Sequence, residues 1–109
     1  MGLDSNDSDR ENKVSKITDS AEGKRCTMRI PGVCCYDNTK TVWAHIRGIR
    51  WGAGGSLKPP DIIGLYACQN CHDILDRRVK TDFDRDYIMQ LAYEGHCESL
   101  SILWEEGII

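Results

Sequence analysis

The sequence predicts a small α+β domain that is held together by a bound zinc ion. A chain of 109 residues has room for one domain and buries a modest fraction of its surface, so a metal can supply part of its stability. Short β-branched segments separated by Gly and Pro turns precede a stretch with helical periodicity. Six cysteines complete the pattern. Four of them are the expected zinc ligands: Cys26, Cys34, Cys68 and Cys71.

The β-structure is expected in three short strands. Residues 25–30 can form a strand that the turn pair Pro31-Gly32 ends. Residues 41–46 are β-branched and aromatic, and residues 62–67 form an apolar run typical of a buried strand. A Gly-rich loop joins the last two strands.

Two helices are expected to follow. The first covers residues 69–79, and Asp82 can cap a last helix with an apolar stripe of Leu100, Leu103 and Trp104. This stripe predicts that the helix covers the core or, as the alternative, forms a homodimer. Cys97, in the same helix, is expected to be buried for packing and has no assigned function.

Charge divides the chain into three parts. Residues 1–22 are polar and acidic and predict a disordered arm, residues 23–80 form the expected zinc domain, and residues 81–109 form the helical cover. Six acidic against three basic residues give −3 over 1–23, ten basic against four acidic give +6 over 24–80, and one against seven gives −6 over 81–109. The basic part suits a polyanion such as DNA, and a merely solvated basic face is the alternative.

The cellular compartment favours metal ligation over disulfides. No apolar stretch of about 18 residues and no signal-peptide pattern is present, so we expect a protein of the cytoplasm with no membrane contact. In that reducing compartment, cysteines serve as metal ligands or free thiols.

The spacing of the cysteines favours a closed zinc site. Cys68 and Cys71 are separated by two residues at a strand-to-helix junction, and the Pro31-Gly32 turn can bring Cys26 and Cys34 to them. Four thiolates leave no open position, which makes the ion structural. Cys35 is the alternative to Cys34, and a redox Cys-x-x-Cys is the alternative to the whole site.

The order strand, loop, strand and helix, with His45 on a strand and His72 at the helix start, resembles the ββα-metal finger of the HNH nucleases. In closer detail, the sequence resembles the YbcO-like nucleases of phages and prophages. The motifs that carry the resemblance are R-I-P-G-V-C (29–34), A-H-I-R (44–47), K-P-P-D (58–61), A-C-Q-N-C-H-D (67–73) and W-E-E-G-I-I (104–109). The family implies a zinc-stapled HNH fold with nuclease activity.

The resemblance also implies roles for single residues. His45 matches the general base that activates water, and His72 matches a ligand of a second, catalytic divalent ion such as Mg²⁺, Mn²⁺ or Ni²⁺. Asp76 lies four residues after His72, so on a helix both share one face and can share the ion. The position before the base, usually a metal ligand, is Ala44. Asp61 lies near the place of the middle Asn, as loop anchor or metal ligand.

Three function classes follow. The first is a metal-dependent HNH-type DNA endonuclease, the second a non-catalytic zinc module that binds DNA or assists recombination, and the third a zinc-stapled protein-interaction module. In the second, His45 and His72 only hydrogen-bond thiolates or carbonyls. Trp43 and Trp51 are expected to pack rather than stack on bases. The expected phosphate contacts are Arg47, Arg50, Lys58, Arg77 and Arg78.

Overall fold

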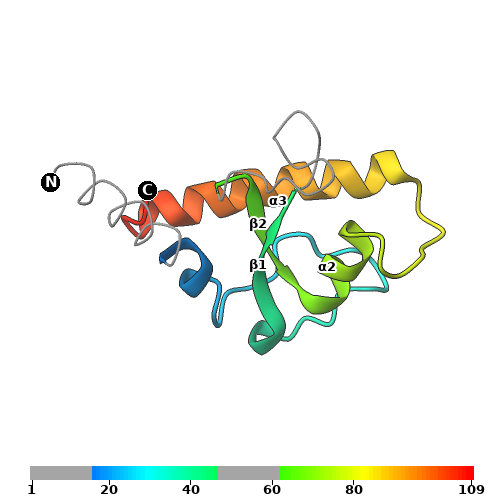
Figure 1. The fold of residues 1–109 in the computed structure, drawn as a ribbon, viewed down its shortest axis with the longest axis horizontal. Helices are drawn as coiled ribbons and strands as arrows, with labels where there is room; N and C mark the ends of the chain where they lie inside the picture. Colours follow the sequence, from blue (N-terminus) through cyan, green and yellow to red (C-terminus); the bar gives the residue numbers. More distant parts are fainter. Residues whose placement is uncertain (1–15, 47–61) are drawn as a thin grey trace, which may run out of the picture.

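The computed structural model describes residues 16–46 and 62–109 (Figure 1). In chain order, the elements are the 3₁₀ turn η1 (Asn38–Lys40), strands β1 (Thr41–His45) and β2 (Gly64–Cys68), and helices α2 (Gln69–Leu75) and α3 (Arg85–Glu105). Helix α3 runs along the length of the molecule and packs on β2, while α2 contacts both strands. The α+β class is as predicted, and, among the described residues, no helix is long and apolar enough to cross a membrane.

Strands β1 and β2 form an antiparallel two-stranded ribbon. Its register pairs Thr41 with Cys68 at one end and His45 with Gly64 at the other. Alternation along the strands gives the ribbon two faces. Ala44 and its partner face one core, whereas Trp43 packs edge-on against Tyr66 on the opposite face, with ring centroids 5.3 Å apart.

The larger core lies between the ribbon, α2, α3 and the segment that carries the first two cysteines. Apolar side chains from all of these parts meet there, and the four expected zinc ligands belong to the same cluster. Its largest fully buried members are Met28, Ile30, Leu65 and Ile88. Metal ligands and hydrophobic core are therefore one packing unit.

A second core covers the other face of the ribbon. Residues 16–20 are helical and place Ile17, 5% exposed, against Trp43, Tyr66 and Leu103. The Ser20 hydroxyl also forms a 2.7 Å hydrogen bond with the Tyr66 hydroxyl. The expected disordered arm over residues 1–22 is thus wrong for residues 16–22, because two buried apolar side chains, Ile17 and Ala21, anchor them. Residues 1–15 lie outside the described residues.

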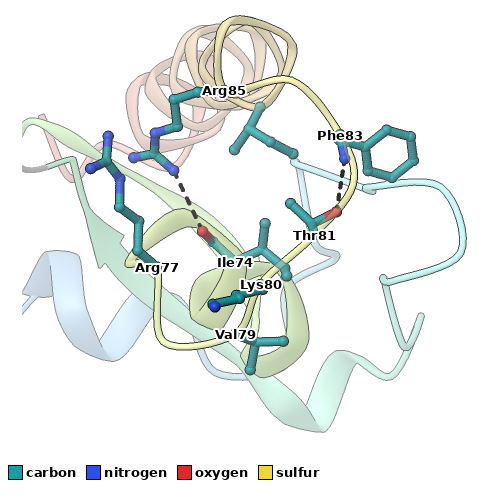
Figure 2. A pocket seen from close by; sticks show the side chains of 8 residues that line it. Ile74, Arg77, Val79, Lys80, Thr81, Phe83 and Arg85 are labelled. Atoms are coloured by element: carbon teal, nitrogen blue, oxygen red, sulfur yellow. Dashed lines mark hydrogen bonds between the residues drawn. The ribbon is translucent and has the colours of Figure 1, made fainter.

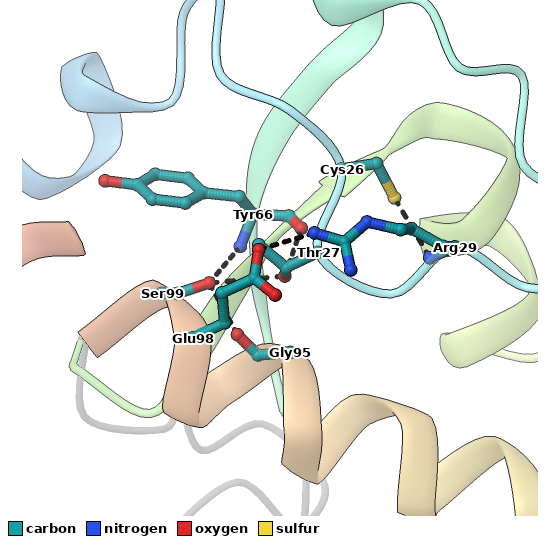
Figure 3. A network of polar contacts seen from close by, with 7 residues as sticks. All are labelled: Cys26, Thr27, Arg29, Tyr66, Gly95, Glu98 and Ser99. Carbon is teal, nitrogen blue, oxygen red and sulfur yellow. Dashed lines mark hydrogen bonds and ion pairs between the residues drawn. The ribbon is translucent and has the colours of Figure 1, made fainter. Parts of the chain in front are cut away.

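The expected strand over residues 25–30 does not form. The segment bends at Thr27, which donates from its backbone N–H and its hydroxyl to the Tyr66 carbonyl at 2.8 and 2.7 Å. Ser99 of α3 accepts from the Tyr66 N–H at 2.9 Å, which ties the helix to the same point (Figure 3). Arg29 has a positive φ of 49°. The chain curls here and presents Cys26 to the other cysteines instead of extending the sheet.

Both helices differ from their expected limits. Helix α2 ends at Leu75, four residues early, because Arg77 adopts a left-handed conformation with a φ of 62° and the Arg78 N–H turns back to the Asp73 carbonyl at 2.8 Å. Arg85 donates to the carbonyls of Ile74 and Leu75 at 3.5 and 3.0 Å and so satisfies the helix end. Helix α3 begins after Asp84, not after Asp82.

The apolar stripe of α3 is only partly buried. Leu103 is fully buried, as expected, but Trp104 is 71% exposed and does not cover the core. Cys97 is exposed, which corrects the expectation of packing. Trp43 is buried as predicted, and Trp51 lies outside the described residues.

Candidate metal centre and adjoining polar site

The four cysteines predicted from the sequence come together in one buried cluster. The sulfurs of Cys26, Cys34, Cys68 and Cys71 all lie within 4.8 Å of one another. They come from three parts of the fold, namely the bent segment after residue 24, the turn before residue 34, and the β2–α2 junction. Cys35 is exposed, so Cys34 is the member of this pair that reaches the cluster.

Local backbone geometry sets each pair of sulfurs. The Cys68 sulfur caps α2 by accepting from the Cys71 N–H at 3.5 Å, and the Cys26 sulfur accepts from the Arg29 N–H at the same distance. Gly32 has a φ of 72°, a conformation that glycine adopts without strain, and the turn returns the chain so that Cys34 N–H reaches the Ile30 carbonyl at 3.0 Å. These N–H groups orient the sulfurs as ligands.

The cluster fits a tetrahedral zinc ion. Two sulfurs that each lie about 2.3 Å from a tetrahedral ion are about 3.8 Å apart. The sulfurs of Cys34 and Cys68 are separated by 3.8 Å. Four buried soft donors with this separation can hold one metal ion such as zinc, and four protein ligands leave it no position for a substrate.

The pKa values of the thiols reflect their crowding. A hydrogen bond with the Cys71 thiol lowers the pKa of Cys26 to about 4, and the same contact raises the pKa of Cys71. Burial raises the pKa of Cys34 to about 11. The close contact of Cys26 and Cys71 therefore favours the thiolate at Cys26, and a dication would stabilise the deprotonated form of its thiol ligands.

A second polar cluster lies on α2, directly after the cysteines. His72 Nε2 lies 3.0 Å from Asp76 Oδ2, so these two residues do share one face as the helical spacing predicts. Their side chains are 17% and 8% exposed. Arg78 Nη2 also contacts Asp76 Oδ2 at 3.2 Å, and His72 Nδ1 is buried without a hydrogen-bond partner in the described part of the chain.

His45 ends β1 and is half-buried. By strand alternation, it lies on the face of Trp43, whereas the buried residues of α2 pack with Ala44 on the other face. The register places His45 at the Gly64 end of the ribbon and α2 begins at the Cys68 end. The expectation that His45 and His72 flank one cleft remains a prediction. It requires α2 to run back along the ribbon toward His45. Helix α2 does contact both strands of the ribbon.

Two of the expected phosphate contacts, Arg77 and Arg78, lie in the described part of the chain. Arg77 is exposed and has a positive φ of 62°, whereas Arg78 is held by Asp73 and Asp76 at 3.4 and 3.2 Å. The remaining candidates lie outside the described residues: Arg47, Arg50, Lys58 and Asp61.

Sequence reasoning missed two side chains beside these sites. His96 Nδ1 lies 2.6 Å from the carbonyl of Gly64, the cross-strand partner of His45. Arg85 caps α2, and burial followed by the nearby charge of Arg77 lowers its pKa. Neither residue has a local sequence signal, because each acts across the α3 interface.

Fold and cysteine cluster together define a small α+β protein with four buried cysteines that could hold one metal ion. A family model described as "Putative nuclease YbcO" matches residues 15–108, and the chain belongs to this family. The family expected from the sequence motifs is thereby confirmed.

Individual relatives agree with the family assignment. Proteins described as "Putative nuclease YbcO" from Escherichia coli K12 and "Putative nuclease ybcO" from Enterobacteria phage 82 are each 40% identical over 97 residues, which is 88% of this chain and 98% of theirs. A solved structure, "Structure of a putative bacteriophage protein from Escherichia coli str. K-12 substr. MG1655", has a TM-score of 0.70 and 40% identity. The alignment covers 83% of this chain and 98% of that one.

Proposed function

We propose that this protein is a metal-dependent HNH-type endonuclease that hydrolyses phosphodiester bonds of DNA in the cytoplasm of a bacterial host. The description of its family as nucleases supports this reaction class. The observation that carries the HNH assignment is the order of elements, in which β1 ends in His45 and β2 leads through Cys68 and Cys71 into α2 with His72. The +6 charge of residues 24–80 supports DNA as the substrate.

In this proposal, the cysteine cluster and the histidines have separate tasks. Zinc at the four cysteines fixes the ribbon against α2 and takes no part in the chemistry. His45 accepts a proton from the attacking water, a task that an imidazole can perform near neutral pH. Its position at a strand end leaves one edge of the ring accessible, consistent with its half-buried state.

His72 and Asp76 are the proposed holders of a divalent ion. One nitrogen and one carboxylate oxygen, 3.0 Å apart on one helix face, form a donor set of the hard and borderline type that Mg²⁺, Mn²⁺ and Ni²⁺ accept. Such an ion, when bound, stabilises negative charge on the phosphate and the leaving oxygen. Arg78 contacts the same Asp76 oxygen from outside the pair, so it competes with an ion for this carboxylate.

A non-catalytic zinc module that binds DNA or assists recombination is the second candidate. Ala44 is fully buried in the larger core, so the position that carries a metal ligand in HNH enzymes is here part of the hydrophobic packing. His72 Nε2, Asp76 and Arg78 also form a chain of contacts on their own, in which both ring and guanidinium reach the same carboxylate oxygen. Both observations favour a binding role over catalysis.

Contacts with other proteins are a further part of the proposal. Tyr93 and Trp104 are exposed on α3 and are available for a homodimer or for an interaction partner. Sedimentation of the wild type against Trp104→Glu would test the dimer, because a charge at a shared apolar surface shifts a dimer toward the monomer.

Nicking of supercoiled plasmid separates the first two candidates. The zinc-loaded wild type should nick DNA when Mg²⁺, Mn²⁺ or Ni²⁺ is added, and His45→Ala should lower the rate about 10²- to 10⁴-fold. DNA affinity and zinc content should stay unchanged. Equal cleavage by the wild type and His45→Ala would indicate a contaminating nuclease and leave the DNA-binding module as the function.

A further inference from the structure

A pocket at the junction of α2 and α3 is not used by the proposed chemistry. It measures about 430 Å³, within the range of about 300–1,000 Å³ found for small-molecule sites. Ile74 and Ile88 supply apolar walls, one from each helix. Figure 2 shows the guanidinium groups of Arg77 and Arg85 on one side and the Phe83 ring on the other.

The charged side chains of this pocket are all cationic. Arg77, Lys80 and Arg85 line it, and the described lining residues include no acidic side chain. Asp82 and Asp84 flank Phe83 in the sequence without lining the pocket. Three positive charges around one concave site are complementary to a phosphate group.

Arg85 differs from the other two cations in how its side chain is held. Arg85 is held in place by the carbonyls of Ile74 and Leu75, and the nearby Arg77 charge contributes to the lowering of its pKa. Arg77 and Lys80 are exposed. An anion placed between the guanidinium groups would relieve their mutual repulsion while Arg85 keeps its bonds to α2.

The opposite wall offers an aromatic surface. Phe83 is 38% exposed and is supported by Tyr87, with ring centroids 5.3 Å apart and the rings tilted by 49°. A ring that is fixed by a neighbour but open on one side can stack with a nucleic-acid base. A base inside a duplex keeps its faces stacked on its neighbours, so only an unpaired base can use this surface.

We propose that the pocket between α2 and α3 binds one unpaired nucleotide of DNA, with its base against Phe83 and its phosphate at Arg77, Lys80 and Arg85. The inference rests on the proposed function, because it makes DNA the ligand. Arg77 directly follows Asp76, so the bound nucleotide adjoins the proposed catalytic ion. The protein therefore selects DNA with single-stranded character, such as gapped, flapped or branched molecules.

Binding without cleavage tests this selection. Fluorescence anisotropy with no added divalent ion would compare a labelled oligothymidylate with a duplex of equal length, using zinc-loaded protein. Phe83→Leu should weaken binding of the oligothymidylate about 5- to 100-fold, the effect of losing one base–aromatic stack, and leave the duplex within about twofold. Trp104→Leu, which removes a more exposed aromatic ring near the other end of the chain's last helix, should change neither affinity.

The phosphate contact has its own matched pair of variants. Arg77→Gln should reduce the salt dependence of oligothymidylate binding by about 0.7 in log–log slope, as expected for one lost phosphate contact. Arg29→Gln removes the same charge outside the pocket, where Glu98 already holds it at 2.6 Å, and should leave the slope unchanged. Circular dichroism would verify that the variants are folded.

The outcomes separate this inference from the proposed function. Phe83-dependent binding of oligothymidylate upholds the pocket even if no preparation nicks DNA. If Phe83→Leu weakens binding of both DNA forms equally, or of neither, the inference is overturned. Nicking that depends on His45 would in that case still support the endonuclease.

Discussion

The cysteine cluster and the His72–Asp76 pair adjoin each other on α2 but differ in how many interaction partners their polar atoms have within the protein. The four sulfurs are buried, within 4.8 Å of one another, and come from distant parts of the chain. His72 and Asp76, in contrast, are four residues apart on one helix and contact each other and Arg78. We therefore expect the first site to need an ion, whereas in the second Asp76 already has two partners and only His72 Nδ1 lacks one among the described residues.

This difference indicates two kinds of metal dependence. Buried thiols without an ion leave weak hydrogen bonds as their only partners, so zinc binding and folding should be coupled. An ion at His72 and Asp76 must compete with an existing pair, so it should bind weakly and exchange. We therefore expect one site to hold the fold and the other to respond to the metal concentration.

The largest expected effect follows from breaking the cysteine cluster. Cys68→Ser should lose zinc and the cooperative melting transition, because structural zinc contributes about 10–16 kcal/mol in small fingers and a domain has about 5–15 kcal/mol in total. Zinc content and thermal melting measure this. Cys35→Ser is the matched control, since its side chain is exposed, and should change neither. A normal melting curve for Cys68→Ser would place the zinc elsewhere.

An intermediate effect is expected from His72→Ala. The variant should keep its zinc and its melting temperature but need about 10- to 100-fold more Mn²⁺ for half-maximal nicking, because a metal contact is lost while the base stays. Asp76→Asn should act in the same direction, more weakly. An unchanged Mn²⁺ requirement in both variants would assign the pair a structural role.

The smallest effect concerns Arg78, which binds the same carboxylate oxygen as His72. Its side chain is 54% exposed, and exposed ion pairs contribute about 0–1 kcal/mol. Arg78→Gln should therefore lower the Mn²⁺ concentration for half-maximal nicking by at most about fivefold, since one competitor for Asp76 is removed. Titration of the nicking rate with Mn²⁺ checks the direction; a higher requirement would mean that Arg78 orients Asp76 for the ion.

The cysteine site could be predicted from sequence because its signal is local. Cys68 and Cys71 have ligand spacing at a strand-to-helix junction, and the Pro31-Gly32 turn returns the chain by itself. The prediction of a strand over residues 25–30 was wrong because the signal for its actual shape is not local. Its β-branched and apolar residues suit a sheet, but presenting Cys26 to the cluster requires a bend that the single-segment pattern does not contain.

Features that depend on contacts between distant residues could not be predicted. Ile17 is one apolar residue in a polar stretch, and only the Trp43–Tyr66 surface makes it an anchor. The partner of the last carbonyl of α2 is Arg85, ten residues beyond Leu75. His45 is an intermediate case between local and distant signals. Its place on β1 could be predicted from the sequence, but the residues that surround it at the end of the ribbon could not.

The most direct test of two separate metal sites is anomalous scattering from a crystal of the zinc-loaded protein soaked in manganese. Data collected on both sides of each absorption edge distinguish the two elements. We expect zinc among Cys26, Cys34, Cys68 and Cys71, and manganese within about 2.2 Å of His72 and Asp76. Zinc at the cysteines with no manganese at His72 and Asp76, while the crystallised protein still nicks DNA in Mn²⁺, would contradict the assignment of the catalytic ion.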